Sequence, residues 1–356
     1  MEKSNGDRIM KKIFLLLLFF TLCSSCIGAE KPFRVMFYNT ENLFDTIDNP
    51  RKNDNEFLPA SAKYWNSKKY WTKQNNLAKV ITALGEWDTP ALIGLCEVEN
   101  KEVLDDLTKK TPLKSQQYRY IITDCEDLRG INVALLYQRD RFRLLQSHAY
   151  PIRFPANKRK KTREILHVAG QVTSGDTLDV FVCHFPSRQG GEEKSEPDRI
   201  YVASVLRAKV DSLMRIRRHP YVLIMGDLND EPSNKSIFNT LNARPIDNSM
   251  AASQLYNLFY AFEKQERKGS YKYGSQWNVI DQIIVSGSLL NPNAPFRALP
   301  ETATIFIQDF MMTTDKSHGG KRPKKTFHGM KYEAGFSDHL PVYIDLIIQK
   351  KKEDGR

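Results

Sequence analysis

Two short segments in the second half of the chain combine carboxylate, amide and imidazole groups at close spacing. The first, Gly-Asp-Leu-Asn-Asp, contains Asp227 and Asn229, and the second, Ser-Asp-His-Leu-Pro, contains Asp338 and His339. A carboxylate or an imidazole can take a proton from water, and an amide can donate a hydrogen bond to an anionic oxygen. This combination suits metal binding and proton transfer.

Further groups of these types lie where apolar runs begin or end. They are Asn39 after residues 33–38, Glu97 after 91–96, His184 after 178–183 and Asp281 near the start of 279–285. Taken singly, Asp281 is more typical of a turn, and His184 is equally typical of a structural histidine. An acid at a helix start is the less favoured interpretation of Glu97, because this residue directly follows an apolar run. Several such residues at strand ends nevertheless favour one shared site at a sheet rim.

The apolar runs themselves predict strands, and a smaller number of amphipathic segments predicts helices. The predicted strands are 33–38, 91–96, 118–123, 132–137, 178–183, 221–226, 279–285 and 340–347, and the predicted helices are 71–84 and 200–214. Strands follow one another without a helix across residues 118–185, which favours antiparallel pairing. The pattern therefore predicts an α/β protein with mixed sheets flanked by helices. Long polar loops are expected at 49–70, 151–164, 186–198 and 310–335.

In chain order, six motifs resemble the endonuclease/exonuclease/phosphatase superfamily, which includes pancreatic-type deoxyribonucleases, abasic-site endonucleases, bacterial sphingomyelinases and inositol polyphosphate 5-phosphatases. The motifs are N-T-E-N, C-E-V-E-N, H-F-P-S, G-D-L-N-D, D-Q-I-I-V-S and G-F-S-D-H-L-P-V. The resemblance covers residues 33–347, and G-D-x-N followed by S-D-H-x-P is specific as a pair. It implies a four-layer α/β sandwich of two mixed sheets flanked by helices, with the site at the sheet rims.

The resemblance also implies a divalent metal ion, with Glu97 as the primary ligand and Asp338 and Asn39 completing the shell. Mg²⁺ is expected, because it prefers one or two carboxylates together with water and phosphate oxygens. Mn²⁺ and Ca²⁺ remain alternatives. No thiolate or histidine cluster suggests Zn²⁺.

Roles for the other residues follow from the same resemblance. His339, oriented by Asp281, is expected to activate water or stabilise the transition state. Asp227 is expected to orient the nucleophilic water and Asn229 to donate to a non-bridging oxygen, while His184 donates to a phosphate oxygen or the leaving group. Whether Asp227 or His339 takes the proton stays open.

Four residues near these motifs extend the predicted site. Arg129 and Arg188 are candidates for substrate binding, because a guanidinium can grip phosphate through paired hydrogen bonds. A solvated arginine is the commoner meaning of each alone. Tyr273 and Trp277 could stack a base, although aromatic residues before a strand usually pack internally.

Composition agrees with a folded protein that meets anionic partners. The 356 residues are 41% hydrophobic and carry a formal net charge of +11, which attracts nucleic acid, phospholipid surfaces or phosphorylated small molecules. Three of the five cysteines follow Ala29, and this odd, widely spaced set is not a disulfide framework. Cys96 and Cys183 end apolar runs and are expected to be packed thiols. Nothing in the sequence implies a protein partner.

The two ends of the chain differ in composition from the catalytic domain expected at 30–350. Residues 1–29 have the charged-then-apolar layout of an export signal, with Lys11 and Lys12 before the run 13–22. Cleavage after Ala29 and lipidation at Cys26 are both open, and membrane anchoring would follow only from lipidation. Residues 351–356 are a charged tail.

Together these features predict an exported, divalent-metal-dependent phosphoester hydrolase, located in the periplasm, outside the cell or lipid-anchored at a membrane surface. The favoured activity is a nuclease-type phosphodiesterase cleaving nucleic acid. The alternative is a phosphatase or phospholipase-C-type enzyme acting on phosphorylated sugars, inositols or lipid headgroups. A non-catalytic binding module of the same fold is less favoured, because no metal or proton-transfer residue is missing.

Overall fold

The computed structural model describes residues 32–86, 88–247, 250–266 and 268–349. The predicted export signal at 1–29, the tail at 351–356 and the outermost residues of the predicted catalytic domain lie outside these residues. Within the described part, no helix combines the length and apolar character needed to cross a membrane.

Two large sheets form the centre of the domain. The first has six strands in the order β14 (Phe296–Ile305), β19 (Val342–Ile348), β1 (Phe33–Leu43), β2 (Leu92–Val98), β4 (Asn132–Tyr137) and β3 (Arg119–Ile122). Only β1 and β2 pair in parallel in this sheet; the other neighbours are antiparallel. The C-terminal strand β19 therefore lies beside the N-terminal strand β1.

The second sheet has seven strands. Their order is β5 (Phe142–Tyr150), β6 (Ile165–Val172), β7 (Thr177–His184), β8 (Tyr221–Asp227), β13 (Asp281–Ser286), β10 (Leu255–Asn257) and β9 (Ala243–Arg244). The pair β7 and β8 is parallel, and β8 and β13 are antiparallel. Both large sheets are therefore mixed, as predicted.

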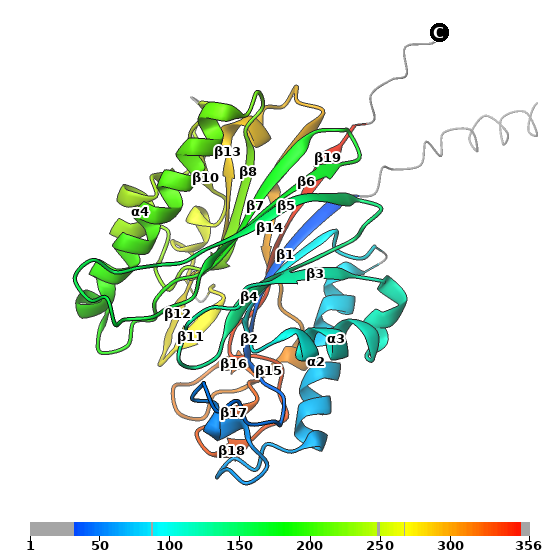
Figure 1. Ribbon diagram of the computed structural model, residues 1–356, viewed down its shortest axis with the longest axis vertical. Coiled ribbons are helices and arrows are strands. Elements are labelled where there is room, and N and C mark those ends of the chain that lie inside the picture. The colour runs from blue at the N-terminus through cyan, green and yellow to red at the C-terminus, as the bar shows by residue number, and fades with distance from the viewer. Residues whose placement is uncertain (1–31, 87, 248–249, 267, 350–356) are drawn as a thin grey trace, which may run out of the picture. The chain divides into compact units, whose positions relative to one another are not determined.

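Helices cover the outer face of each sheet, which gives the four-layer α/β sandwich (Figure 1). They are α2 (Ser67–Gly85), α3 (Lys101–Lys109) and α4 (Glu192–Ile216). Asn66 and Asn100 cap α2 and α3 by accepting the N–H groups of Lys69 and Val103. One apolar cluster lies between the sheets and under α2 and α3, and a second packs α4 against β7 and β8.

Close packing between the sheets depends on a glycine in β2. A Cβ on Gly94 would lie 2.7 Å from the Sδ atom of Met225 in β8. Real side chains do not approach so closely, so the absence of a side chain at position 94 lets β2 and β8 face each other directly. Residues two positions further along each strand, Cys96 and Asp227, lie on the same facing surfaces.

Short elements fill the connections. Three hairpins are formed by β11 (Tyr271–Tyr273) with β12 (Gln276–Asn278), β15 (Met312–Thr314) with β16 (Lys321–Pro323), and β17 (Phe327–His328) with β18 (Lys331–Tyr332). Short helices are η1 (Asn55–Phe57), η2 (Pro112–Gln116), η3 (Ser236–Thr240), η4 (Tyr260–Phe262), η5 (Gly287–Leu290) and η6 (Asp309–Met311). The last two hairpins lie at one end of the domain in Figure 1, next to the start of α2.

The predicted strands all exist, but three long strands, the helix α3, part of α4 and the two hairpins within the loop expected at 310–335 were not predicted. β5 has mostly exposed side chains, so it lacks the apolar run that marks a strand, and β6 and β14 were also not predicted. The loop expected at 186–198 is wrong in its second half, because α4 begins at Glu192. Two acidic residues in its first turn favour that start, although Pro197 lies inside the helix.

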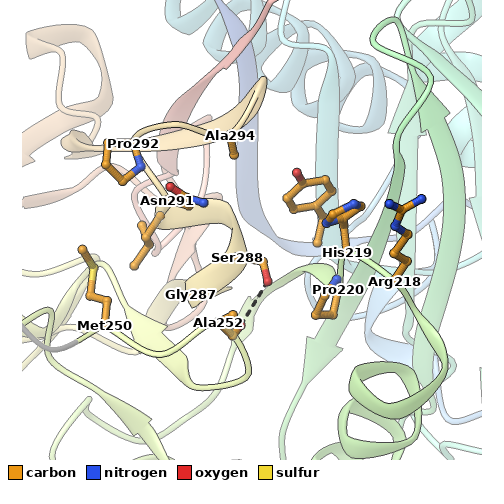
Figure 2. Close-up of a pocket in the computed structure, with 12 residues that line it drawn as sticks. Arg218, His219, Pro220, Met250, Ala252, Gly287, Ser288, Asn291, Pro292 and Ala294 are labelled. Atoms are coloured by element: carbon orange, nitrogen blue, oxygen red, sulfur yellow. Dashed lines mark hydrogen bonds between the residues drawn. The ribbon is translucent and has the colours of Figure 1, made fainter.

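A cavity of about 350 Å³ lies at the end of the seven-stranded sheet where β8 begins and β13 ends. Figure 2 shows Arg218, His219 and Pro220 on one side of it and Gly287 and Ser288 on another, with Ser288 bonded to the carbonyl of Ala252. None of the predicted site residues lines this cavity. The predicted residues gather instead at the opposite end of these strands.

Candidate active site

Three predicted residues form one row across the seven-stranded sheet. His184 ends β7 and is paired in register with Asp227 at the end of β8, which is paired with Asp281 at the start of β13. Residues paired in this way present their side chains on the same face of a sheet. The Nε2 atom of His184 accordingly lies 3.6 Å from Oδ2 of Asp227. Gly226 precedes Asp227 because a Cβ there would lie 2.4 Å from the carbonyl oxygen of Cys183.

His339 joins this row from the segment before β19. Its Nδ1 atom lies 2.7 Å from Oδ2 of Asp281, and its Nε2 atom lies 3.9 Å from Oδ2 of Asp227. The ring of Tyr271 packs on the imidazole at 4.7 Å between centroids. The carboxylate of Asp281 therefore fixes one ring nitrogen and leaves the other facing Asp227.

The six-stranded sheet contributes its residues through two adjacent irregularities. The pairing of β1 with β2 shifts between Asn39 and Leu43, and the pairing of β2 with β4 shifts between Cys96 and Val98. Asn42 and Glu97 both adopt left-handed backbone conformations there, with φ of 55° and 59°. The N–H of Asn42 donates to Oε2 of Glu97 at 2.9 Å. Such bulges redirect side chains, and here they turn Glu97 toward the rim.

Asn39 connects the two sheets. Its Nδ2 atom donates to Oδ2 of Asp227 at 3.1 Å and lies 3.4 Å from Nε2 of His339. Its Oδ1 atom accepts the backbone N–H of Glu41 at 2.9 Å. In this orientation Asn39 presents a donor to the site, while its oxygen, the atom expected to bind metal, is held by the backbone.

Asp338 is held in place by the helix α2. The Nζ atom of the buried Lys73 donates to the carbonyl of Phe336 at 2.6 Å and lies 3.5 Å from Oε2 of Glu41. One turn further along, Asn76 donates to the carbonyl of Gly335 at 2.7 Å. These contacts fix the backbone immediately before Asp338, whose side chain is 30% exposed and whose Oδ1 lies 4.0 Å from Nε2 of His339.

The buried titratable groups differ in protonation. Burial raises the pKa of Asp227 to about 7, although His339 acts in the opposite direction. Burial alone would lower the pKa of His339, but Asp281 and Asp227 outweigh it and hold that pKa well above its usual range. Burial and the charge of Arg163 lower the pKa of His184 well below its usual range. His339 is therefore a cation at neutral pH, and His184 is a neutral imidazole.

Asn229 lies beside a buried arginine that the sequence did not single out. Its Nδ2 atom donates to the carbonyl of Phe185 at 3.0 Å, and the guanidinium of Arg163 donates to the same oxygen. Arg163 also pairs with Asp127 at 3.4 Å. This arrangement places a permanent positive charge directly behind the predicted phosphate-binding residues.

The two predicted arginines have different surroundings. The Nε atom of Arg188 donates to the carbonyl of Asn229 at 2.8 Å, and its other nitrogens contact Glu192 and Asn234. Arg129 is 47% exposed, lies 3.7 Å from a carboxylate oxygen of Asp127, and its charge helps to lower the pKa of His184. Arg188 thus supports the backbone of the site, whereas Arg129 keeps a guanidinium open to solvent beside it.

Of the residues missed, only Lys73 had a recognisable signal. It lies four positions before Leu77 and thus on the apolar face of α2, where a lysine is unusual. Arg163 follows the run Lys158–Lys161, and nothing in the sequence distinguishes it from these surface charges. Tyr271 and the exposed Tyr273 are the two ends of a three-residue strand, which is too short to predict from periodicity.

The donor set of the site suits a hard divalent cation. Glu97 and Asp338 are carboxylates with 14% and 30% of their side chains exposed, and the Asn42 N–H already fixes Glu97. Among the described residues, two groups of acid, histidine and cysteine side chains have ligand atoms within 4.8 Å of one another. One group is Cys96, His184 and Asp227, and the other is Asp227, Asp281 and His339. Neither group contains Glu97 or Asp338. Sparse protein ligation is what Mg²⁺ tolerates, because water and substrate oxygens fill its remaining positions.

Comparison with known proteins gives a family match and a fold match. Residues 34–348 match the model of the Endonuclease/Exonuclease/phosphatase family, which is divalent-metal dependent. No curated protein matches the sequence.

Solved structures share the fold at low identity. An endonuclease/exonuclease/phosphatase family protein from Bacteroides thetaiotaomicron is 15% identical, with a TM-score of 0.56 over 92% of this chain and 98% of that one. A mannosyl-6-phosphatase from the same organism is 16% identical, with a TM-score of 0.54 over 88% and 99%. TDP2 from D. rerio, complexed with a single-strand DNA product, is 15% identical, with a TM-score of 0.53 over 89% and 99%.

Proposed function

Because the chain belongs to the endonuclease/exonuclease/phosphatase family, it has a phosphoesterase fold, and we propose that it is an exported, Mg²⁺-dependent phosphodiesterase that cleaves nucleic acid. The observation that carries this proposal is the single row of His184, Asp227 and Asp281, closed by His339 and faced by Glu97. Such a row offers a base, donors to anionic oxygen and a metal ligand around one point, as phosphoester hydrolysis requires.

In the proposed mechanism, Glu97 and Asp338 would hold Mg²⁺, which would neutralise phosphoryl charge when bound. Asp227 orients the attacking water and takes its proton, because it is the carboxylate nearest to Nε2 of both histidines. A pKa of Asp227 near 7 suits a base that works at neutral pH.

His339 and His184 have complementary roles in this mechanism. His339, held by Asp281 through Nδ1, donates from Nε2 to a phosphoryl oxygen and stabilises the charge that develops there. The neutral His184 has one proton to donate, to a phosphate oxygen or the leaving group. Asn229 adds a hydrogen bond once substrate displaces its contact with Phe185.

Charge near the site supports an extended anionic substrate. Arg163 lies buried behind the phosphate position, and Arg129 reaches solvent beside it. Tyr273 is 74% exposed on the same strand as Tyr271, which packs on His339. A cation and an exposed aromatic ring near a catalytic centre suit a backbone phosphate with an attached base.

A substrate panel tests this function. Protein starting at residue 30 would be incubated with plasmid DNA, RNA, sphingomyelin and phosphomonoesters, with Mg²⁺ or with EDTA, and the His339→Ala variant would serve as the blank for contaminating enzymes. We expect EDTA-sensitive cleavage of nucleic acid that falls steeply with salt. Turnover of phosphomonoesters or sphingomyelin alone would instead support the phosphatase or phospholipase alternative.

Export is tested separately on the full-length chain. We propose that residues 1–29 direct export, because a basic pair precedes an apolar run. Expression followed by fractionation and mass measurement of the N-terminus should give a chain that begins after Ala29, or a lipidated chain that begins at Cys26. An unprocessed cytoplasmic product would contradict export without affecting the assignment of the catalytic residues.

A further inference from the structure

A thiol lies directly beneath the catalytic row. Cys96 is fully buried at the end of β2 and is paired in register with Asn39 of β1, so both side chains lie on the face turned toward the other sheet. Gly94 lies two residues before Cys96 on the same face of β2 and packs against Met225 of β8. Asp227 lies two residues after Met225 on the same face of β8. The two strands therefore bring Cys96 opposite Asp227.

His184 completes a mixed set of ligand types at this point. A sulfur of Cys96, a ring nitrogen of His184 and a carboxylate oxygen of Asp227 all lie within 4.8 Å of one another. The Nδ1 atom of His184 is buried without a hydrogen-bond partner, and its Nε2 atom lies 3.6 Å from Asp227 and 3.9 Å from Oε1 of Glu97. No strong hydrogen bond thus holds this imidazole in its present place.

We infer that Cys96, His184 and Asp227 form a site for a thiophilic divalent cation such as Zn²⁺, and that its occupancy blocks the catalytic centre. Zn²⁺ favours four ligands drawn from thiolate, imidazole and carboxylate, and Oε1 of Glu97 or a water is available for the fourth position. Ligand atoms around Zn²⁺ lie about 3.5 Å apart, so this set must close by roughly 1 Å. On binding, the thiol proton leaves to solvent as the metal–sulfur bond forms.

The consequence is a choice between two kinds of metal at one rim. Mg²⁺ is a hard cation and has little affinity for a thiol, so it remains at the exposed carboxylates. Zn²⁺ binds nitrogen and sulfur ligands far better than Mg²⁺ does, and it would remove Asp227 from its role toward water. This inhibitory effect rests on the proposed function, whereas metal binding by the three residues does not.

Direct binding is the first test. Metal-free wild-type protein, Cys96→Ser and Cys96→Ala would be titrated with Zn²⁺ by equilibrium dialysis and with Co²⁺, whose bond to a thiolate gives a near-ultraviolet charge-transfer band. We expect the band in the wild type and in the controls Cys125→Ser and Cys183→Ser, which alter the other two buried thiols. Loss of Cys96 should abolish the band and weaken Zn²⁺ binding about tenfold or more. A wild type without the band, or a Cys96→Ala variant that keeps it, would overturn the inference.

Inhibition is the second test and depends on a working assay. With saturating Mg²⁺, Zn²⁺ should inhibit the wild type, and Cys96→Ala should need about tenfold more Zn²⁺ for half inhibition. Equal inhibition of both proteins would place the inhibitory Zn²⁺ at Glu97 and Asp338 and overturn the proposal. Circular dichroism and Mg²⁺-supported turnover identify which Cys96 variant is folded, and the Co²⁺ titration gives its result even if no substrate is cleaved.

Discussion

The rims of the two sheets supply different chemistry because they are built differently. On the seven-stranded sheet, His184, Asp227 and Asp281 occupy register-paired positions of regular strands and are almost fully buried. On the six-stranded sheet, Glu97 projects from a bulged strand end with a left-handed backbone and reaches solvent. Regular pairing fixes the spacing of groups that exchange protons, whereas the bulge exposes a carboxylate to an incoming cation.

This difference suggests a division of tasks. A buried row tunes pKa values through desolvation and close charges, which is what proton transfer requires. A more exposed carboxylate can exchange water for metal. Asn39 lies between the rims and connects them, because its amide donates to Asp227 while its backbone neighbours carry the bulge. The following predictions test this division.

Removal of the metal should have the largest effect. Because the proposed chemistry needs a cation at Glu97 and Asp338, chelation should abolish turnover, and added Mg²⁺ should restore it. The measurement is initial rate against free Mg²⁺ in chelator-buffered solution. Glu97→Gln should raise the Mg²⁺ concentration needed for half-maximal rate, whereas full turnover in chelated buffer would refute a metal-dependent mechanism.

His339→Ala should lower kcat by roughly 10²-fold or more, because a positioned proton-transfer or charge-stabilising group is lost. The Mg²⁺ concentration for half-maximal rate should change little, since the imidazole belongs to the buried row. Steady-state kinetics at several Mg²⁺ concentrations would show this. If the main effect fell on Mg²⁺ activation instead, the division between the two rims would be wrong.

Asp281→Asn should also lower kcat sharply with little change in KM, because the contact of 2.7 Å to Nδ1 of His339 loses its charge. The two residues should behave as one unit, so adding Asp281→Asn to His339→Ala should cost little more activity. The four-member cycle would be measured by kcat and by denaturant midpoint. Additive losses of activity would mean that Asp281 does not act through His339.

Asp227→Asn should stabilise the metal-free protein at alkaline pH while abolishing activity. A carboxyl whose folded pKa of about 7 exceeds its unfolded value of about 3.8 stabilises the fold fully only below the unfolded value, and that stability is lost as the pH rises toward 7. The amide removes this loss, so unfolding at pH 8 in EDTA should require about 1 kcal/mol or more of additional free energy. Denaturant titrations of both proteins at pH 5 and pH 8 provide the check, and an unchanged pH dependence would contradict the raised pKa.

Asn76→Ala should have the smallest effect, confined to metal activation. Its amide holds the carbonyls of Ala334 and Gly335 just before Asp338. Without these bonds Asp338 is less well placed, so half-maximal activation should need more Mg²⁺, by about tenfold or less, at nearly unchanged kcat. The neighbouring Asn75→Ala is the matched control, because the Asn75 side chain donates to the carbonyl of Trp71 within α2. A Mg²⁺ requirement equal in both variants would remove α2 from the positioning of Asp338.

The sequence predicted the seven-stranded rim more completely than the six-stranded rim, for a physical reason. Residues that follow an apolar run, such as His184 and Asp227, can be identified in the sequence as candidates for the site, because the end of a strand lies at the rim of its sheet. The amide orientation of Asn39 could not be predicted, since it depends on the backbone at Glu41. Arg163 lies in a loop whose path is set by tertiary contacts with Asp127 and Phe185.

The fold class was predicted correctly, whereas individual elements were predicted where local patterns were strong and missed where they were weak. Buried strands such as β4 match the predicted range, because an apolar run has few alternatives. The exposed edge strand β5 was missed, because its pairing with β6 rather than its composition defines it. The start of α4 was missed for a related reason, since its first turns are polar and carry Pro197.

The pairing of β1 with β19 sets the order in which the site can form. Asn39 and His339 are 300 positions apart, and they meet only when the last strand has docked against the first. Contacts of such long sequence separation form late, because closing the intervening loop is entropically costly. A nascent chain that has not been completed through β19 therefore lacks His339 and has no assembled catalytic centre. The proposed hydrolytic activity would therefore require that β19 has docked against β1.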